Sequence, residues 1–373
     1  MRPRSKPDAL TILLVRPRLI GDVILTTPLI GLLKEAYPAA EIDLLVGRGT
    51  GEFLEKDPRV RRVLYSEKKG KGYFRDIFGK YDLAINLNAS DRGNIAILLA
   101  GRKARIGFYQ GAAFWHNIWK KLLFTFPIPF PGYIHVARIG QLVIEAMGFR
   151  VERLKAKVFW DVADEKTVRS ALSEKGCDSP YFVVHPFARW DYKYWRMERF
   201  AEVSDALVER YGWQPVWTSS PDGNEIEILR EAARLCRHRP VLIPGEFSLN
   251  QMTCLLARSS FYLGLDTAIS HLAATTGVPM VALYGPTQAE RWSPWNNDGP
   301  VAQQCPALRG RQRSGYMVML QKEWECVPCG RAGCGDRGGE SPCLAAIEVE
   351  EVLDAVHSLL GTTAAKREES RDS

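Results

Sequence analysis

The stretch Gly264-Leu-Asp-Thr-Ala-Ile-Ser-His-Leu-Ala-Ala-Thr-Thr-Gly-Val-Pro-Met-Val-Ala-Leu-Tyr-Gly-Pro-Thr287 begins at the end of one apolar run and contains a second, with a helical segment between them. The runs cover residues 261–265 and 280–284, and their length and composition predict buried strands. We expect Gly277 to end the helix, because glycine is common just after a helix. A strand, a helix and a second strand in so short a stretch indicate an α/β fold with a parallel sheet.

The polar residues between the first strand and the helix favour an anionic ligand. Asp266 and Thr267 are residue types that cap helix starts, and His271 lies one turn after Thr267. Free N–H groups and the helix dipole attract anions there, and ligands of parallel sheets bind at the carboxyl ends of strands. One interpretation is a phosphate or nucleotide site. In the other, Asp266 only caps the helix and His271 is a core histidine.

The composition is that of a soluble globular protein with two domains. The 373 residues are 46% hydrophobic and 25% charged, and the net charge is +7. Basic residues gather in the first third, which favours an anionic partner for the N-terminal half. A solvated basic face is the alternative. No recognised nucleic-acid motif accompanies the charge, so we expect no nucleic-acid partner.

Apolar runs alternate with helical patterns in two halves that begin alike, with a strand, a polar loop and a helix. This predicts two doubly wound domains. We expect the first domain at residues 1–160, the second at 161–348, a last helix at 349–361 and a disordered tail at 362–373. The expected strands are 11–15, 42–46, 63–65, 83–86, 181–184, 215–218, 241–243, 261–265 and 280–284.

Polar residues after the first strand of each half are candidates for chemistry. Asp22 follows the first strand and is either a general base or an ordinary helix cap. Arg189 and Lys193 lie in the corresponding loop of the second half, where lysine is a typical phosphate contact. Ser219 lies at the start of a turn-rich loop that favours a nucleotide pocket.

Five of the eight cysteines lie between Cys305 and Cys343. Cys326, Cys329, Cys334 and Cys343 include a Cys-x-x-Cys pair and are a candidate structural zinc site. Reduced thiols or an incidental disulfide are the alternative.

The sequence predicts a cytoplasmic protein, since its first residues lack a long apolar signal segment and no stretch is long enough to span a bilayer. Residues 114–130 are rich in aromatics, including Trp115 and Trp119, and carry two lysines. They are either an interfacial segment that rests on a membrane surface or a partly buried helix and loop.

Several motifs resemble the lipopolysaccharide heptosyltransferases, glycosyltransferase family 9. They are Arg18-Leu-Ile-Gly-Asp-Val-Ile-Leu-Thr-Thr-Pro28, Arg105-Ile-Gly107, His185-Pro with Lys193-Tyr-Trp195, Asp266-Thr267 with His271-Leu-Ala-Ala274, and Gly285-Pro-Thr287. They occur in the family's order over nearly the whole chain. Trp292-Ser-Pro-Trp295 and the cysteine-rich segment look most like the heptosyltransferase III subgroup.

The resemblance implies a GT-B fold, in which two Rossmann-like domains face each other across a cleft. It also implies inverting transfer of L-glycero-D-manno-heptose from ADP-heptose to the lipopolysaccharide inner core. No cofactor is expected to be required. The expected membrane surface is then the cytoplasmic face of the inner membrane. Asp22 matches the catalytic aspartate. The residues assigned to the donor are Arg189, Lys193, Ser219, Asp266, Thr267, Ala268 and His271. Ala268 departs from the family, because many members have glycine there. The residues assigned to an anionic acceptor are Arg16, Arg18, Arg61 and Arg105. A transferase for another nucleotide sugar and a non-catalytic basic protein that binds anionic lipid are the alternatives.

Overall fold

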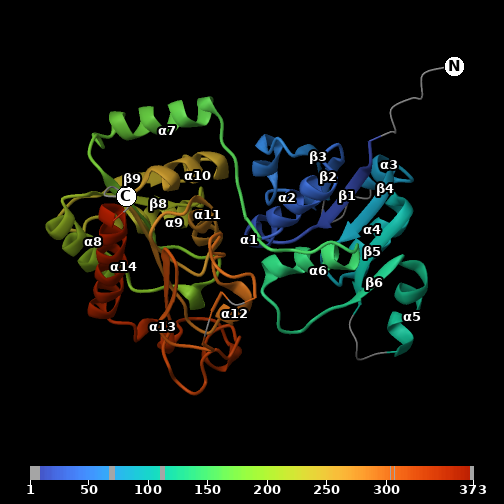
Figure 1. Ribbon diagram of the computed structural model, residues 1–373. Helices are drawn as coiled ribbons and strands as arrows, with labels where there is room; N and C mark the ends of the chain where they lie inside the picture. The colour runs from blue at the N-terminus through green and yellow to red at the C-terminus, as the bar shows by residue number, and fades with distance from the viewer. Residues whose placement is uncertain (1–8, 67–71, 110–113, 303, 306, 370–373) are drawn as a thin grey trace. The chain divides into compact units, whose positions relative to one another are not determined.

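The structure is a computed structural model that describes residues 9–66, 72–109, 114–302, 304–305 and 307–369, without the side chains of 114–117 and 362–369. It divides into two compact units, Met1–Phe159 and Trp160–Ser373. Each unit contains its own sheet with helices packed around it (Figure 1). The predicted α/β class with two parallel-sheet domains is therefore confirmed.

In the described part of unit 1, six parallel strands have the order β3-β2-β1-β4-β5-β6. The chain moves outward from β1 to β3 and then returns to the other side of β1, so the strand order reverses between β1 and β4. Such a reversal is where doubly wound sheets bind ligands. The strands are β1 (Thr11–Arg16), β2 (Glu41–Gly47), β3 (Val60–Ser66), β4 (Tyr81–Asn86), β5 (Gly101–Tyr109) and β6 (Phe126–Pro129).

Proline divides the first helical region of unit 1. Pro28 lies in the first turn of the second of two short helices, where the N–H that proline lacks would have no intrahelical partner. The helices are α1 (Ile20–Ile24), α2 (Thr27–Ala36), α3 (Tyr73–Ile77), α4 (Asp91–Ala100), α5 (Phe114–Leu123) and α6 (Ile139–Ala146), with 3-10 turns η1 (Glu52–Lys56) and η2 (Val136–Arg138).

In the described part of unit 2, seven strands have the order β12-β13-β11-β10-β7-β8-β9. Only β12 and β13 pair antiparallel among these strands, and the order reverses between β7 and β10. The strands are β7 (Tyr181–His185), β8 (Gln214–Ser219), β9 (Val241–Pro244), β10 (Phe261–Leu265), β11 (Met280–Leu283), β12 (Gln312–Ser314) and β13 (Met317–Leu320). All five residues of β10 are buried, as expected for a central parallel strand.

The helices of unit 2 include the one predicted between β10 and β11. Gly277 follows it with φ of 78°, the left-handed conformation that glycine adopts without strain. The helices are α7 (Val162–Glu174), α8 (Met197–Tyr211), α9 (Gly223–Ala232), α10 (Leu249–Arg258), α11 (Ala268–Thr276), α12 (Ala289–Trp292), α13 (Pro342–Ala345) and α14 (Val349–Glu369), with 3-10 turns η3 (Asp191–Lys193) and η4 (Cys334–Asp336).

The last helix is longer than expected. The chain stays helical past Gly361 to Glu369, so the part of the expected disordered tail up to Glu369 is helical instead. A single glycine costs about 1 kcal/mol in a helix interior, and the alanine, lysine, arginine and glutamate residues that follow are good helix formers. Residues 370–373 of that expected tail lie outside the described residues.

Candidate active site

A buried ion pair lies at the strand-order reversal of unit 1. Arg16 is the last residue of β1, and its Nη2 lies 2.7 Å from Oδ1 of Asp22 in α1. The two residues are only 3% and 7% exposed. Arg16 also donates to the backbone carbonyl of Leu87, just after β4. Arg16 therefore connects the side chain of Asp22 to the C-terminal ends of the two central strands, β1 and β4.

Burial lowers the pKa of the Arg16 guanidinium below its ordinary value, and the opposing charge of Asp22 acts against this shift. Asp22 accepts the bond from Arg16 through its Oδ1 atom. Asp22 lies in the first turn of α1 and does not cap it, since the N-cap position is Leu19. The general-base role stays a prediction.

The other arginines assigned to the acceptor do not gather around Asp22. Arg18 is exposed in the loop after β1, and Arg105 lies in the middle of β5. Arg61 stands at the start of β3. Because β1 and β3 run parallel, Arg61 lies near the amino ends of the strands, whereas Asp22 lies beyond their carboxyl ends.

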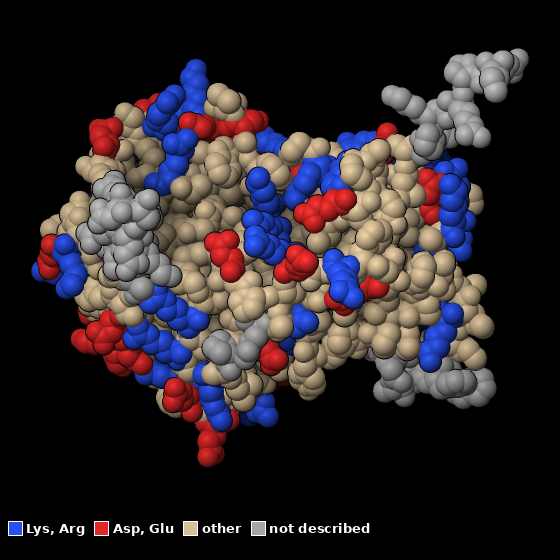
Figure 2. All heavy atoms as spheres, viewed as in Figure 1, with Lys and Arg blue, Asp and Glu red and all other residues tan. Residues whose placement is uncertain are grey.

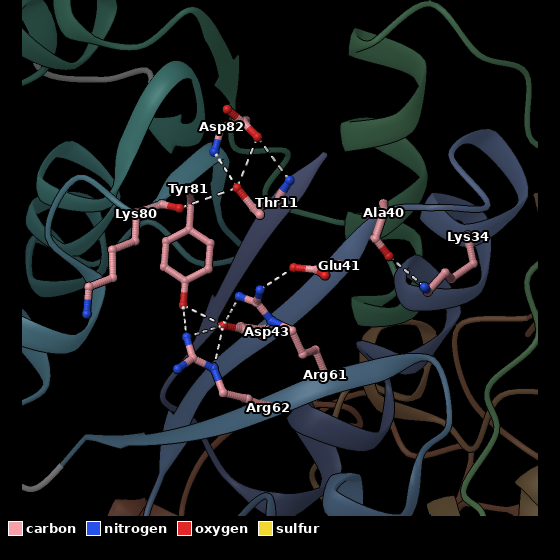
Figure 3. Close-up of polar contacts among 10 residues, drawn as sticks. All are labelled: Thr11, Lys34, Ala40, Glu41, Asp43, Arg61, Arg62, Lys80, Tyr81 and Asp82. Atoms are coloured by element: carbon pink, nitrogen blue, oxygen red, sulfur yellow. Dashed lines mark hydrogen bonds and ion pairs between the residues drawn. The ribbon is translucent and has the colours of Figure 1, made fainter. Parts of the chain in front are cut away.

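Arg61 belongs to an ionic cluster around Asp43, which is drawn in Figure 3. Asp43 is fully buried and accepts two bonds from Arg61, two from Arg62 and one from the Tyr81 hydroxyl. Although burial raises the pKa of the Asp43 carboxyl, these donors together hold it below its ordinary value. Arg61 thus has a structural partner, and its assignment to the acceptor gains no support from its position.

Charge pairing also modifies the expectation of a basic N-terminal face. Arg59 pairs with Asp57, and both Arg102 and Lys103 pair with Asp82. On the face drawn in Figure 2, lysine and arginine side chains lie beside aspartate and glutamate side chains rather than forming one continuous basic area. Much of the positive charge in the first third is thus locally balanced.

A second ion pair lies at the strand-order reversal of unit 2. Nζ of Lys193, in η3, lies 2.5 Å from Oδ2 of Asp266, which follows β10. Their side chains are 17% and 8% exposed. Lys193 is 73 residues away from Asp266 in the sequence, so the fold brings together two residues that were assigned separately to the donor.

Helix α11 begins directly beside this pair without a side-chain cap. Thr267 occupies the N-cap position, but its side chain accepts no hydrogen bond from the helix. The capping role considered for Asp266 and Thr267 is therefore wrong, because Asp266 is bound to Lys193 instead. The first N–H groups of α11 remain without an intrahelical partner, as at any helix start. Ala268 is the first helical residue, a backbone conformation that does not require glycine.

Further predicted donor residues surround the same sheet edge. His271 is buried in α11, and Ser219 is the last residue of β8. Arg189 is exposed in the loop after β7, with its guanidinium 5.2 Å from the Trp190 ring centroid. Ser219 and Asp266 thus lie at the same end of the sheet, and Arg189 lies in the loop after β7.

Two further buried polar residues lie at this sheet edge and were not assigned to the site. His185 ends β7, and its Nδ1 lies 2.9 Å from the Thr218 hydroxyl. Burial lowers the pKa of His185 to about 3, so it is neutral at physiological pH. Gln321 directly follows β13. Both positions could have been found by extending the strand-end rule to every buried strand.

The predicted zinc site is not assembled. Among the described residues, no group of three or more histidine, cysteine, aspartate or glutamate side chains is arranged to hold a metal ion. Cys326, Cys329 and Cys334 are exposed free thiols, and Cys343 is a buried one. Burial, together with the charges of Cys329 and Cys334, raises the pKa of the Cys343 thiol to about 11.

Comparison with known proteins agrees with the geometry. The model of glycosyltransferase family 9 (heptosyltransferase) matches residues 73–309. Lipopolysaccharide heptosyltransferase 3 of Escherichia coli K12 is 31% identical over 291 residues, which cover 74% of this chain and 83% of the relative. The protein is a member of glycosyltransferase family 9.

Solved structures of the family share the fold. The glycosyl transferase family 9 protein from Veillonella parvula has a TM-score of 0.77 at 21% identity and covers 95% of this chain and 98% of its own. The E. coli ADP-heptose LPS heptosyltransferase II has a TM-score of 0.70 at 20% identity, with 95% and 100% covered. The GT-B fold of this glycosyltransferase is thereby established. In the described residues, no helix has the length and apolarity to cross a membrane.

Proposed function

We propose that this heptosyltransferase moves L-glycero-D-manno-heptose from ADP-heptose to the inner core of lipopolysaccharide, with inversion at the anomeric carbon. The observation that carries the proposal is the Lys193–Asp266 pair beside the uncapped start of α11. A helix start offers N–H groups and a partial positive charge to a diphosphate. The E. coli relatives act on lipopolysaccharide, and one is named for ADP-heptose.

In the donor half, the ammonium of Lys193 and the N–H groups of α11 stabilise the negative charge that develops on the departing ADP. Asp266 holds Lys193 in place before the donor binds. Since these groups supply positive charge at the diphosphate, we propose that transfer needs no divalent metal.

In the acceptor half, Asp22 acts as the general base. It takes the proton from the acceptor hydroxyl while the hydroxyl oxygen bonds to the anomeric carbon and the bond to ADP breaks. Arg16 positions the carboxylate through the 2.7 Å ion pair. Among the other three arginines assigned to the acceptor, we keep Arg18 as a candidate contact, because it is exposed in the loop between β1 and α1.

The deciding experiment is an in vitro transfer assay with defined truncated core acceptors and linkage analysis of the product. ADP-heptose and UDP-sugars are supplied in parallel, with and without EDTA. Transfer from ADP-heptose that persists in EDTA is the expected result. Transfer only from another nucleotide sugar contradicts the donor assignment, and loss of transfer in EDTA contradicts the metal-free mechanism.

We also propose that α5 and the start of β6 rest on an anionic membrane surface. Leu122, Leu123 and Phe126 are exposed by 76%, 49% and 38%, and Lys121 is exposed beside them. Apolar side chains next to a lysine suit the boundary between lipid headgroups and acyl chains. Trp119 packs edge-on against Phe124 with centroids 6.1 Å apart, while the Trp115 side chain lies outside the described residues.

Cosedimentation with vesicles that contain anionic lipid tests this surface. We expect Leu122→Glu to weaken binding several-fold, because a carboxylate is repelled by the lipid headgroups. Leu235→Glu, at an exposed leucine of unit 2, is the matched control. Equal binding of both variants and the unsubstituted protein contradicts the proposed surface.

A further inference from the structure

The turn that follows β11 is held through three consecutive backbone carbonyls. Nε2 of Gln321 donates to the carbonyl of Gly285 at 2.7 Å and to that of Thr287 at 3.0 Å. Between them, the carbonyl of Pro286 accepts a bond of 2.7 Å from the backbone N–H of Gly330. Each carbonyl of the turn thus has a donor supplied by a later part of the chain.

Gln321 is well suited to this role. It directly follows β13, it is only 5% exposed, and both atoms that face its Nε2 are carbonyl oxygens. Only the nitrogen end of the amide can donate to them, so the turn dictates the orientation of the side chain. A side chain of similar size without N–H groups would leave the buried carbonyl of Gly285 and the partly buried carbonyl of Thr287 without this donor.

The cysteine-rich segment, which runs from Cys326 to Cys343 in α13, contacts the turn from a second direction. Gly330, which binds Pro286, directly follows Cys329. A Cβ atom added at Gly285 would lie 3.1 Å from Cβ of Leu344 in α13, so this helix packs closely against the turn. The segment's described cysteines are free thiols. Hydrogen bonds and packing, rather than disulfides, therefore hold it to the turn.

The turn lies at the edge of the sheet that carries Asp266. Strand β11 pairs in parallel with β10, with Leu283 opposite Leu265. Asp266 and the turn 285–287 therefore leave the same sheet edge on neighbouring strands, while β13 brings Gln321 to that edge from the other side of β11.

We propose that Gln321 is a positioning residue for donor binding, and that it acts by fixing the turn 285–287 together with Gly330. This inference rests on the proposed donor site at Asp266. It also gives the cysteine-rich segment a role without metal: the segment supplies Gly330 and α13, which complete the enclosure of the turn.

The test compares two glutamine variants in the full-length enzyme. Gln321→Met removes the two donors, and Gln214→Met removes the bond of 3.0 Å from Gln214 to Gly176 at the start of β8. For Gln321→Met we expect KM for ADP-heptose and Kd for ADP to rise about tenfold, the size expected for one or two lost hydrogen bonds. We expect kcat to change less than KM, and Gln214→Met to leave both constants unchanged.

A second variant separates positioning from general damage to the fold. Gln321→Glu places acceptor oxygens against the carbonyls at neutral pH, whereas its protonated form regains one donor. Relative to the unsubstituted enzyme, its KM for the donor should therefore improve as the pH falls to mildly acidic values. A merely structural defect would not recover on acidification.

The outcomes distinguish this inference from the proposed function. An unsubstituted enzyme that neither binds ADP nor uses ADP-heptose overturns the proposed function. An active enzyme whose Gln321→Met and Gln214→Met variants have the same donor KM overturns the inference alone, as does a Gln321→Glu variant whose defect is independent of pH.

Discussion

Nη2 of Arg16 lies 2.7 Å from Oδ1 of Asp22, and both side chains are almost completely buried. A buried charge is stable only when it is paired, so each residue of this pair depends on the other. The pair connects the last residue of β1 to the first helix at the point where the strand order of unit 1 reverses. The carboxylate that we propose as the general base thus also contributes to the stability of unit 1.

Replacing Asp22 with Asn tests the general base. The amide keeps the shape of the side chain but cannot take the acceptor proton, so we expect kcat to fall roughly 100-fold or more. Binding of ADP, measured by calorimetry, should be unchanged because the donor residues lie in unit 2. Transfer at the unsubstituted rate by Asp22→Asn would remove the general-base role.

Replacing Arg16 with Met tests the structural dependence of the pair. The substitution leaves the Asp22 carboxylate buried without its partner, and we expect a loss of about 3–5 kcal/mol in the free energy of unfolding. Denaturant unfolding measures this loss. Arg18→Met is the control, because Arg18 is exposed, and it should change stability by less than about 0.5 kcal/mol.

Replacing Lys193 with Ala tests the donor site. If the ammonium stabilises the departing diphosphate as we propose, its removal should weaken binding of ADP and lower kcat by roughly 10- to 100-fold. Lys175→Ala is the control, since Lys175 also forms an ion pair in unit 2, with Glu246, but its side chain is 34% exposed. An equal effect of both variants on ADP affinity would count against the assignment of Lys193.

The ionic cluster around Asp43 makes the stability of unit 1 depend on pH. The folded-state pKa of Asp43 is below its ordinary value of about 4. Its contribution is therefore fully present above that ordinary value and is lost as the pH falls toward the folded-state pKa. We expect Asp43→Asn to cost about 1–3 kcal/mol at neutral pH, a range reduced because Arg61 and Arg62 are partly exposed.

The effect of Asp43→Asn on the free energy of unfolding should itself depend on pH, which provides a control. The difference in unfolding free energy between Asp43→Asn and the unsubstituted protein should shrink as the pH drops below 4, because the Asp43 carboxyl then becomes protonated. Chemical denaturation across this range measures it. A difference that stays constant with pH would show that the carboxylate charge does not hold the cluster together.

The sequence by itself determined the α/β class and most of the strands. Buried parallel strands appear as continuous apolar runs, as in residues 261–265 and 280–284, because both faces of such a strand are covered. Polar residues directly after those runs, such as Asp266, could be assigned to a ligand site by the strand-end rule alone. The resemblance to family motifs then implied the roles that we propose for Asp22 and Lys193.

Only the tertiary structure decided how the polar residues are partnered. Arg61 was assigned to the acceptor, yet strand pairing places it beside Asp43 at the opposite end of the sheet from Asp22. Asp266 binds Lys193 instead of capping α11. Gln321, which follows β13 and is 36 residues after Gly285, reaches the turn 285–287. Hydrophobic patterning is local and repeats along the chain, whereas hydrogen bonds and ion pairs depend on which distant segments the sheet order makes neighbours.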